Sequence, residues 1–144
     1  MESKPKVYLY HTAVKWTEQR KGVISCAGKP DIQVATPPEF KGHEGIWSPE
    51  DLFLASANIC VMTTFLAVAE RAGLAFTSYE SVAEGKLELV DGKFQFTAIT
   101  LKPTITLPAN ADAAKAKELI EKAEANCLIS NSMKARVSLE PTIR

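Results

Sequence analysis

The sequence predicts an α+β fold in a single domain that covers residues 1–144. Two observations carry this prediction. A long apolar helix begins at Ser48, and strand-like segments lie before and after it, including two alternating runs joined by Asp91-Gly92. The expected order is a strand meander, a helix, a hairpin, a second helix and a final strand, which is typical of an α+β domain. A length of 144 residues also suits one domain.

The N-terminal segment predicts three short antiparallel strands at residues 6–17, 23–28 and 31–37. These stretches are rich in β-branched and aromatic residues with partial alternation. Gly22 ends the first turn, and the sequence Gly28 to Pro30 separates the second strand from the third. The prolines and glycines of residues 37–47 then predict a loop.

The long helix has a clear start signal. Ser48 is a favourable N-cap, and Pro49 suits the first helical position. Glu50 and Asp51 fall in the first turn, where the helix dipole favours negative charge. Asp51 can also complete a capping box with Ser48. With Gly73 as the stop, the sequence predicts a helix of roughly 24 residues.

Residues 52–69 carry no charge, which is nearly enough apolar length to span a bilayer. However, Ser56, Asn58, Thr63 and Thr64 interrupt this stretch, and no basic cluster flanks it. We therefore expect no membrane insertion. A buried core helix, packed against a second copy of itself, fits the pattern better.

The C-terminal half predicts a hairpin, a helix and a strand. Asp91-Gly92 between alternating runs indicates a tight turn. Residues 97–107 continue as a strand, in which Pro103 predicts an edge position or a bulge. Residues 108–127 predict an alanine-rich helix that ends near Cys127, followed by a turn or short helix and a last strand.

Composition excludes several functional classes. Seventeen basic and seventeen acidic residues give zero net charge, which argues against a nucleic-acid binder. Residues 1–16 show no secretory signal, and an odd number of cysteines does not suit a disulfide framework, so we expect a cytoplasmic protein. His11 and His43 are far apart and C-x-x-C is absent, so we expect no metal and no cofactor.

The three cysteines are Cys26, Cys60 and Cys127, and Cys60 lies in the middle of the long helix. A buried free cysteine usually behaves as a small apolar residue, and Cys26 is expected to do so. Cys60 would become reactive only if a nearby cation lowered its pKa. Arg20, held by the carboxylate of Glu50, is a candidate for that cation. Sequence spacing alone does not bring these groups together.

Four segments resemble the OsmC/Ohr family of thiol-dependent peroxidases, and the likeness covers nearly the whole chain. They are "EQRKG", "ATPPEFKGHEGIWSPEDLFLASANIC", "YESVAEGKLELVDGKFQFTAITLKPTI" and "AEANCLISNSMKARVSLEP". The most specific feature is S-P-E-x-L followed by a helical cysteine ten residues after the glutamate, in combination with the second cysteine.

The resemblance implies a fold and a mechanism. It implies an intertwined homodimer in which antiparallel sheets enclose two main helices, with the active site at the subunit interface. Cys60 is similar to the peroxidatic cysteine and Cys127 to the resolving cysteine. Arg20 is similar to the arginine that stabilises the thiolate, and Glu50 to its carboxylate partner. The implied partners are an organic hydroperoxide and a dithiol reductant, which is lipoyl-type in well-known members.

The chain departs from the two well-described branches in several places, among them its "WSPED" opening, where "NPE" is more usual. Asn58 and Ile59 replace small residues before the first cysteine, and Leu128 replaces a proline after the second. This pattern indicates a less characterised branch. Two other functions stay open: a non-catalytic dimer that binds a small apolar ligand, and a general thiol–disulfide exchanger, which the lack of C-x-x-C disfavours. Phe53, Met62 and Phe65 line such a pocket or form plain core.

Overall fold

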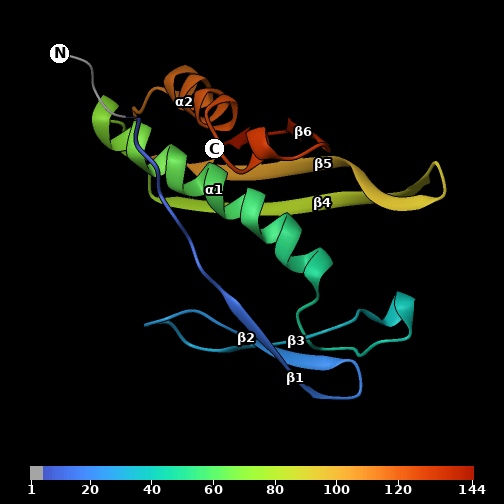
Figure 1. Ribbon diagram of the computed structural model, residues 1–144. Coiled ribbons are helices and arrows are strands. Elements are labelled where there is room, and N and C mark those ends of the chain that lie inside the picture. The colour runs from blue at the N-terminus through green and yellow to red at the C-terminus, as the bar shows by residue number, and fades with distance from the viewer. Residues whose placement is uncertain (1–4) are drawn as a thin grey trace. The chain divides into compact units, whose positions relative to one another are not determined.

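The computed structural model describes residues 5–144 and divides the chain into two compact units, Met1–Leu52 and Phe53–Arg144 (Figure 1). Each unit has its own sheet. The α+β class predicted from the sequence is confirmed, while the single domain over residues 1–144 stays a prediction.

The N-terminal unit contains the predicted antiparallel meander, with strands β1 (Ala13–Glu18), β2 (Lys21–Ser25) and β3 (Ile32–Ala35). The strands are shorter than predicted. None of the described strands pairs with residues 7–12, so the first strand begins at Ala13 rather than near residue 6. The second ends before Cys26, because the chain turns through Gly28 with a positive φ of 79°.

A short 3-10 turn, η1 (Pro38–Phe40), leads to helix α1 (Pro49–Ala72). The predicted capping box is present. The Ser48 amide and hydroxyl both donate to the Asp51 carboxylate at 2.9 Å, and the Asp51 amide donates to the Ser48 hydroxyl at 3.1 Å. These bonds satisfy amides that a helix start leaves without partners. They fix the first residue of the helix that carries Cys60.

The C-terminal unit contains β4 (Ser78–Val90), β5 (Lys93–Thr106), α2 (Ala113–Ala125), η2 (Ser130–Ser132), β6 (Arg136–Leu139) and β7 (Thr142–Ile143). Strands β4 and β5 form the predicted hairpin, in which both Asp91 and Gly92 have positive φ, as the turn requires. Strands β6 and β7 add to β5 in parallel, so this sheet is mixed rather than purely antiparallel.

The expected edge position or bulge at Pro103 is wrong, because β5 is paired on both sides and the irregularity of the hairpin lies between Lys86 and Leu87. The sheet nevertheless tolerates the missing backbone N–H of Pro103 for a physical reason. Pro103 faces the gap between β6, which pairs as far as Leu101, and β7, which begins to pair at Thr104. A missing donor costs little where no neighbouring strand needs it.

The core of the C-terminal unit lies between the mixed sheet and both helices. Alternate residues of β5 are buried on one face of the sheet, which leaves that face for α1 and α2 (Figure 1). The buried side chains are Val61, Phe65, Val68, Ala69, Ile99, Leu101, Ile105, Leu119, Ile120, Ala123, Cys127 and Ala135. Helix α1 is therefore the core helix that the sequence predicts.

By length and composition α1 could also cross a membrane, as core helices of this kind often could. Only 33% of its most apolar stretch is buried within the described residues. The remaining apolar surface includes Ile59 and Leu66, which are exposed. A helix with this much exposed apolar surface can pack against a further partner.

Removing the cap should destabilise the protein. We expect Ser48→Ala to lower the free energy of unfolding by about 1 kcal/mol, because it leaves helix amides without acceptors. Urea unfolding measures this change. The control is Ser56→Ala, whose hydroxyl donates to the Phe53 carbonyl inside the helix and caps nothing, so stability should be unchanged or slightly raised. Equal losses in both variants would contradict the capping role.

Candidate functional site

The fold brings two predicted site residues together, Cys60 and Cys127. Cys60 lies in the middle of α1 and is half-buried. Cys127 follows the C-cap of α2, just before η2, and is fully buried. The Cys127 thiol donates a hydrogen bond to the Cys60 sulfur, while both cysteines remain free thiols. Residues 67 positions apart in sequence therefore form a thiol pair within one unit.

Neutral donors surround the Cys60 sulfur. The chain after α2 supplies two of them, the backbone amides of Ile129 and Leu128, and α1 supplies the hydroxyl of Thr64. Burial alone would raise the pKa of Cys60, but the bonds from Cys127, Ile129, Thr64 and Leu128 outweigh it, and the pKa lies below its ordinary value. The surroundings therefore favour the thiolate, which is the nucleophilic form.

Cys127 has the opposite tendency. Burial raises its pKa, and its role as donor to the Cys60 sulfur raises the pKa further. The Ser130 amide, 3.5 Å from the Cys127 sulfur, opposes this only in part. When the pair holds one proton, that proton stays on Cys127 and the negative charge on Cys60. The two thiols thus have different chemical characters.

Arg20 and Glu50 lie in the N-terminal unit. Arg20 belongs to the two-residue turn between β1 and β2, and its Nη1 donates to the Phe40 carbonyl at 2.8 Å. The arginine also lines a pocket of about 350 Å³ together with Trp16, Val34 and Pro49. Among the residues that the structure describes, no ion pair joins Arg20 to Glu50.

Glu50 sits in the first turn of α1 and is half-buried. One carboxylate oxygen, Oε2, is buried without a hydrogen-bond partner. A buried carboxylate oxygen is costly unless a donor satisfies it. Glu50 therefore has an acceptor available for a cation such as Arg20.

The other candidate residues are not part of the thiol pair. Cys26 donates to the His11 carbonyl at 3.5 Å in the N-terminal unit. Phe65 is fully buried and packs on Phe76 and Tyr79, which makes it core rather than pocket lining. Phe53 stacks on Phe96 with ring centroids 5.2 Å apart.

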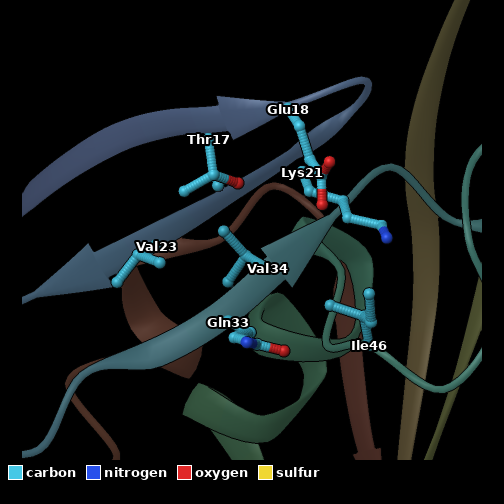
Figure 2. Close-up of a pocket in the computed structure, with 8 residues that line it drawn as sticks. Thr17, Glu18, Lys21, Val23, Gln33, Val34 and Ile46 are labelled. Atoms are coloured by element: carbon cyan, nitrogen blue, oxygen red, sulfur yellow. The ribbon is translucent and has the colours of Figure 1, made fainter.

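The N-terminal unit also has a pocket of about 210 Å³ between β1, β2, β3 and the loop before α1 (Figure 2). Figure 2 shows that side chains of mixed character line it, among them Glu18, Lys21 and Gln33. No cysteine belongs to this lining. Over residues 5–144, no group of three or more His, Cys, Asp or Glu side chains is arranged to hold a metal ion.

Three donors to Cys60 were missed by sequence reasoning: the Thr64 hydroxyl and the amides of Leu128 and Ile129. The spacing of four residues between Cys60 and Thr64 places them on the same helix face and could have pointed to the threonine. The amides leave no signal, because every residue except proline carries one. The family resemblance leads one to expect a proline at position 128. Leu128 stands there instead and, unlike a proline, has a backbone N–H to donate.

Comparisons with known proteins agree with this picture. Over 101 residues, 70% of this chain and 69% of the relative, the sequence is 33% identical to peroxiredoxin OsmC of Escherichia coli. It is 27% identical over 135 residues to the uncharacterized protein YmaD of Bacillus subtilis, covering 91% and 90% of the two chains.

The fold resembles the solved structure of an OsmC-like protein from Vibrio cholerae, with a TM-score of 0.86 and 22% identity. The match covers 94% of this chain and 99% of that one. The profile of the OsmC-like protein family matches residues 42–142, which include both members of the thiol pair and Glu50. The chain therefore belongs to the OsmC-like protein family.

Proposed function

We propose that this protein is a cysteine-based peroxidase that reduces organic hydroperoxides, with Cys60 as the nucleophile and Cys127 as the resolving thiol. The observation that carries the proposal is the asymmetric thiol pair, in which four donors converge on the Cys60 sulfur and one of them is Cys127. Membership of a family that includes a peroxiredoxin supports the same chemistry.

The first step is attack of the Cys60 thiolate on the terminal oxygen of the hydroperoxide. The O–O bond breaks, the sulfur is oxidised to sulfenic acid, and the alkoxide leaves and takes a proton to become an alcohol. In the second step the Cys127 sulfur attacks the Cys60 sulfenic acid, forming a disulfide and releasing water. The interaction between the Cys127 and Cys60 thiols supports this pairing over one that involves Cys26.

An external dithiol completes the cycle by two exchange steps, leaving both cysteines reduced and the dithiol oxidised to its own disulfide. A lipoyl-type dithiol is the candidate that the family resemblance implies. The cycle suits a reducing compartment such as the cytoplasm, where structural disulfides are rare.

Two exposed apolar side chains support an organic substrate. Ile59 precedes Cys60 and is 55% exposed, and Leu128 follows Cys127 and is 68% exposed. The Leu128 amide contacts the Cys60 sulfur, so this residue lies at the thiol itself. An alkyl substituent gains more from contact with such groups than hydrogen peroxide does.

Arg20 is proposed to stabilise the thiolate and orient the peroxide, with Glu50 as its carboxylate partner. The partnerless Oε2 of Glu50 supports a charged hydrogen bond at that position. The guanidinium has five N–H donors, so it can keep the Phe40 carbonyl and also donate to a carboxylate.

A homodimer is proposed as the functional form. The first strand presents Val14 and Trp16, which are 72% and 70% exposed and lie on the same face of β1. Helix α1 leaves most of its apolar stretch uncovered. Exposed apolar area of this kind is typical of a surface that a partner covers.

Peroxide treatment should produce one specific disulfide. We expect one equivalent of tert-butyl hydroperoxide to convert Cys60 and Cys127 to an intramolecular disulfide, with Cys26 left free. Alkylation under denaturing conditions and peptide mass mapping would show it. A Cys26→Ser variant should react identically, whereas Cys127→Ser should accumulate a sulfenic acid on Cys60 that dimedone captures. Three reduced thiols after treatment of the wild type would refute the peroxidase and favour an apolar-ligand binder.

Loss of the arginine should weaken the nucleophile. We expect Arg20→Ala to raise the pKa of Cys60 and to lower its thiolate fraction near neutral pH by roughly tenfold, because a nearby cation favours the charged form. Iodoacetamide kinetics against pH measure this. Arg71→Ala is the matched control, since Arg71 lies eleven residues along α1, about 16 Å away. Unchanged kinetics in Arg20→Ala would remove Arg20 from the mechanism.

A charge on the exposed face of β1 should disrupt the dimer. We expect Val14→Asp to shift the protein toward monomer in sedimentation experiments, because the carboxylate loses water at an apolar interface. Lys15→Asp, with its side chain on the opposite face of β1, should stay dimeric. A monomeric wild type, or equal masses for Val14→Asp and the wild type, would count against this interface.

A further inference from the structure

Two polar side chains are buried in the part of the chain that the structure describes, Ser48 and Ser130. The Ser48 hydroxyl is fully used, because it donates to the Asp51 carboxylate and accepts from the Asp51 amide. Ser130 is only 8% exposed, and its hydroxyl oxygen is buried without a hydrogen-bond partner. A buried hydroxyl that lacks a partner lowers stability, so its presence needs an explanation.

The backbone polar groups of Ser130 are both paired. The Ser130 amide donates to the Cys127 sulfur at 3.5 Å, and the Ser130 carbonyl accepts from the Met133 amide at 3.2 Å. The Asn131 amide closes the same turn by donating to the Cys127 carbonyl at 3.0 Å. The backbone of Ser130 is therefore fixed against the Cys127 sulfur, and the hydroxyl is the polar group of this residue that is left without a partner.

The Cys127 sulfur is within reach of this hydroxyl. Because the amide of the same residue already contacts the sulfur, rotation about χ1 can re-aim the Ser130 oxygen while the backbone stays in place. A serine hydroxyl is a donor as well as an acceptor, and a negatively charged sulfur accepts a stronger hydrogen bond than a neutral thiol does. A thiolate at Cys127 would therefore give the hydroxyl the partner that it lacks.

The electrostatics of Cys127 agree with this geometry. Burial and the bond to Cys60 raise the pKa of Cys127, whereas the side chain and the amide of Ser130 lower it. Ser130 is thus the residue that opposes the cost of a negative charge on this sulfur.

The proposed cycle twice places negative charge on Cys127. In the resolving step its sulfur attacks the Cys60 sulfenic acid: the S–S bond forms, the S–O bond breaks, and the hydroxide that leaves takes the Cys127 proton to become water. In the reducing step a thiolate of the external dithiol attacks the Cys60 sulfur, and Cys127 leaves as a thiolate. Because Cys127 is fully buried, a charge on it is costly unless a donor is present.

We propose that Ser130 is a further residue of the reactive site, whose hydroxyl donates to the Cys127 sulfur when that sulfur carries negative charge. The inference rests on the proposed function in that Cys127 is taken as the resolving thiol. It explains the unpaired hydroxyl of the reduced protein, which gains an acceptor only in the steps that charge Cys127. A donor that acts on the charged form alone accelerates those steps.

The test titrates Cys127 in a protein that carries Cys26→Ser and Cys60→Ser, so that Cys127 is the remaining cysteine. The chemical shift of its ¹³C-labelled Cβ reports the thiolate, and the buried sulfur needs no contact with a reagent. We expect Ser130→Ala to raise the Cys127 pKa and to lower the thiolate fraction below the midpoint by about two- to tenfold, as loss of one hydrogen bond implies. Ser130→Thr keeps the hydroxyl and should leave the titration unchanged.

The matched control is Ser132→Ala, because the Ser132 hydroxyl is exposed and donates to the Leu128 carbonyl at 2.7 Å. This variant loses the same atom from the same segment and should keep the parent titration. An unchanged midpoint in Ser130→Ala, or an equal rise in Ser132→Ala, would overturn the proposal.

Thermal unfolding of each variant separates the proposed role from a structural one. Ser130→Ala removes a buried hydroxyl that has no partner, so we expect its melting temperature to be unchanged or raised while the Cys127 pKa rises. If Ser130→Ala unfolds, Ser130→Thr and Ser130→Val give the same comparison, since they have the same shape and differ in the hydroxyl. Equal midpoints in that pair would also refute the role of the hydroxyl.

Peroxide takes no part in the titration, so its outcome is separate from that of the peroxidase. A wild type that forms no disulfide with peroxide would refute the proposed function but leave the Ser130 hydroxyl as a donor to the Cys127 thiolate. A Ser130→Ala titration identical to its parent would sink the donor role while the disulfide test still succeeds.

Discussion

The hydrogen bond from the Cys127 thiol to the Cys60 sulfur is the interaction on which the rest of the site depends. It gives direction to a pair that would otherwise be symmetric. A donor lowers the pKa of the group that accepts and raises its own, so one contact favours the negative charge on Cys60 and the proton on Cys127. In the proposed cycle the same two sulfurs form the disulfide, so activation and resolution would share this contact.

This contact needs two elements that are far apart in sequence. Helix α1 must begin at a fixed residue, which the Ser48–Asp51 capping box ensures, and α2 must end where its following segment can reach α1. The shared core of α1, β5 and α2 sets the distance between the two helices. The thiol pair is therefore a consequence of core packing, and changes that loosen this core should disturb the pair as well as lower stability.

Much of the fold could be predicted from the sequence, because its signals are local. The cap at Ser48, the hairpin turn at Asp91-Gly92 and the end of α2 near Cys127 each follow from a few neighbouring residues. The wrong prediction at Pro103 shows the limit of such local signals. A proline signals a missing amide, but only the tertiary arrangement shows that the break between β6 and β7 lies beside it. The parallel pairing of β5 with β6 is equally non-local, and no short sequence pattern predicts it.

The same difference between local and non-local signals applies to the candidate site. Four side chains were predicted through a family resemblance, and the structure brings Cys60 and Cys127 into contact within one unit. The backbone donors could not have been predicted, since their identity lies in the path of the chain after α2 and not in a residue type. Such neutral, directional donors act only at contact distance and resist salt, whereas the charge of an arginine acts over a longer range and is screened when exposed. The two kinds of stabilisation are therefore physically distinct. The neutral donors come with the folding of the C-terminal unit, whereas the proposed cation, Arg20, belongs to the N-terminal unit.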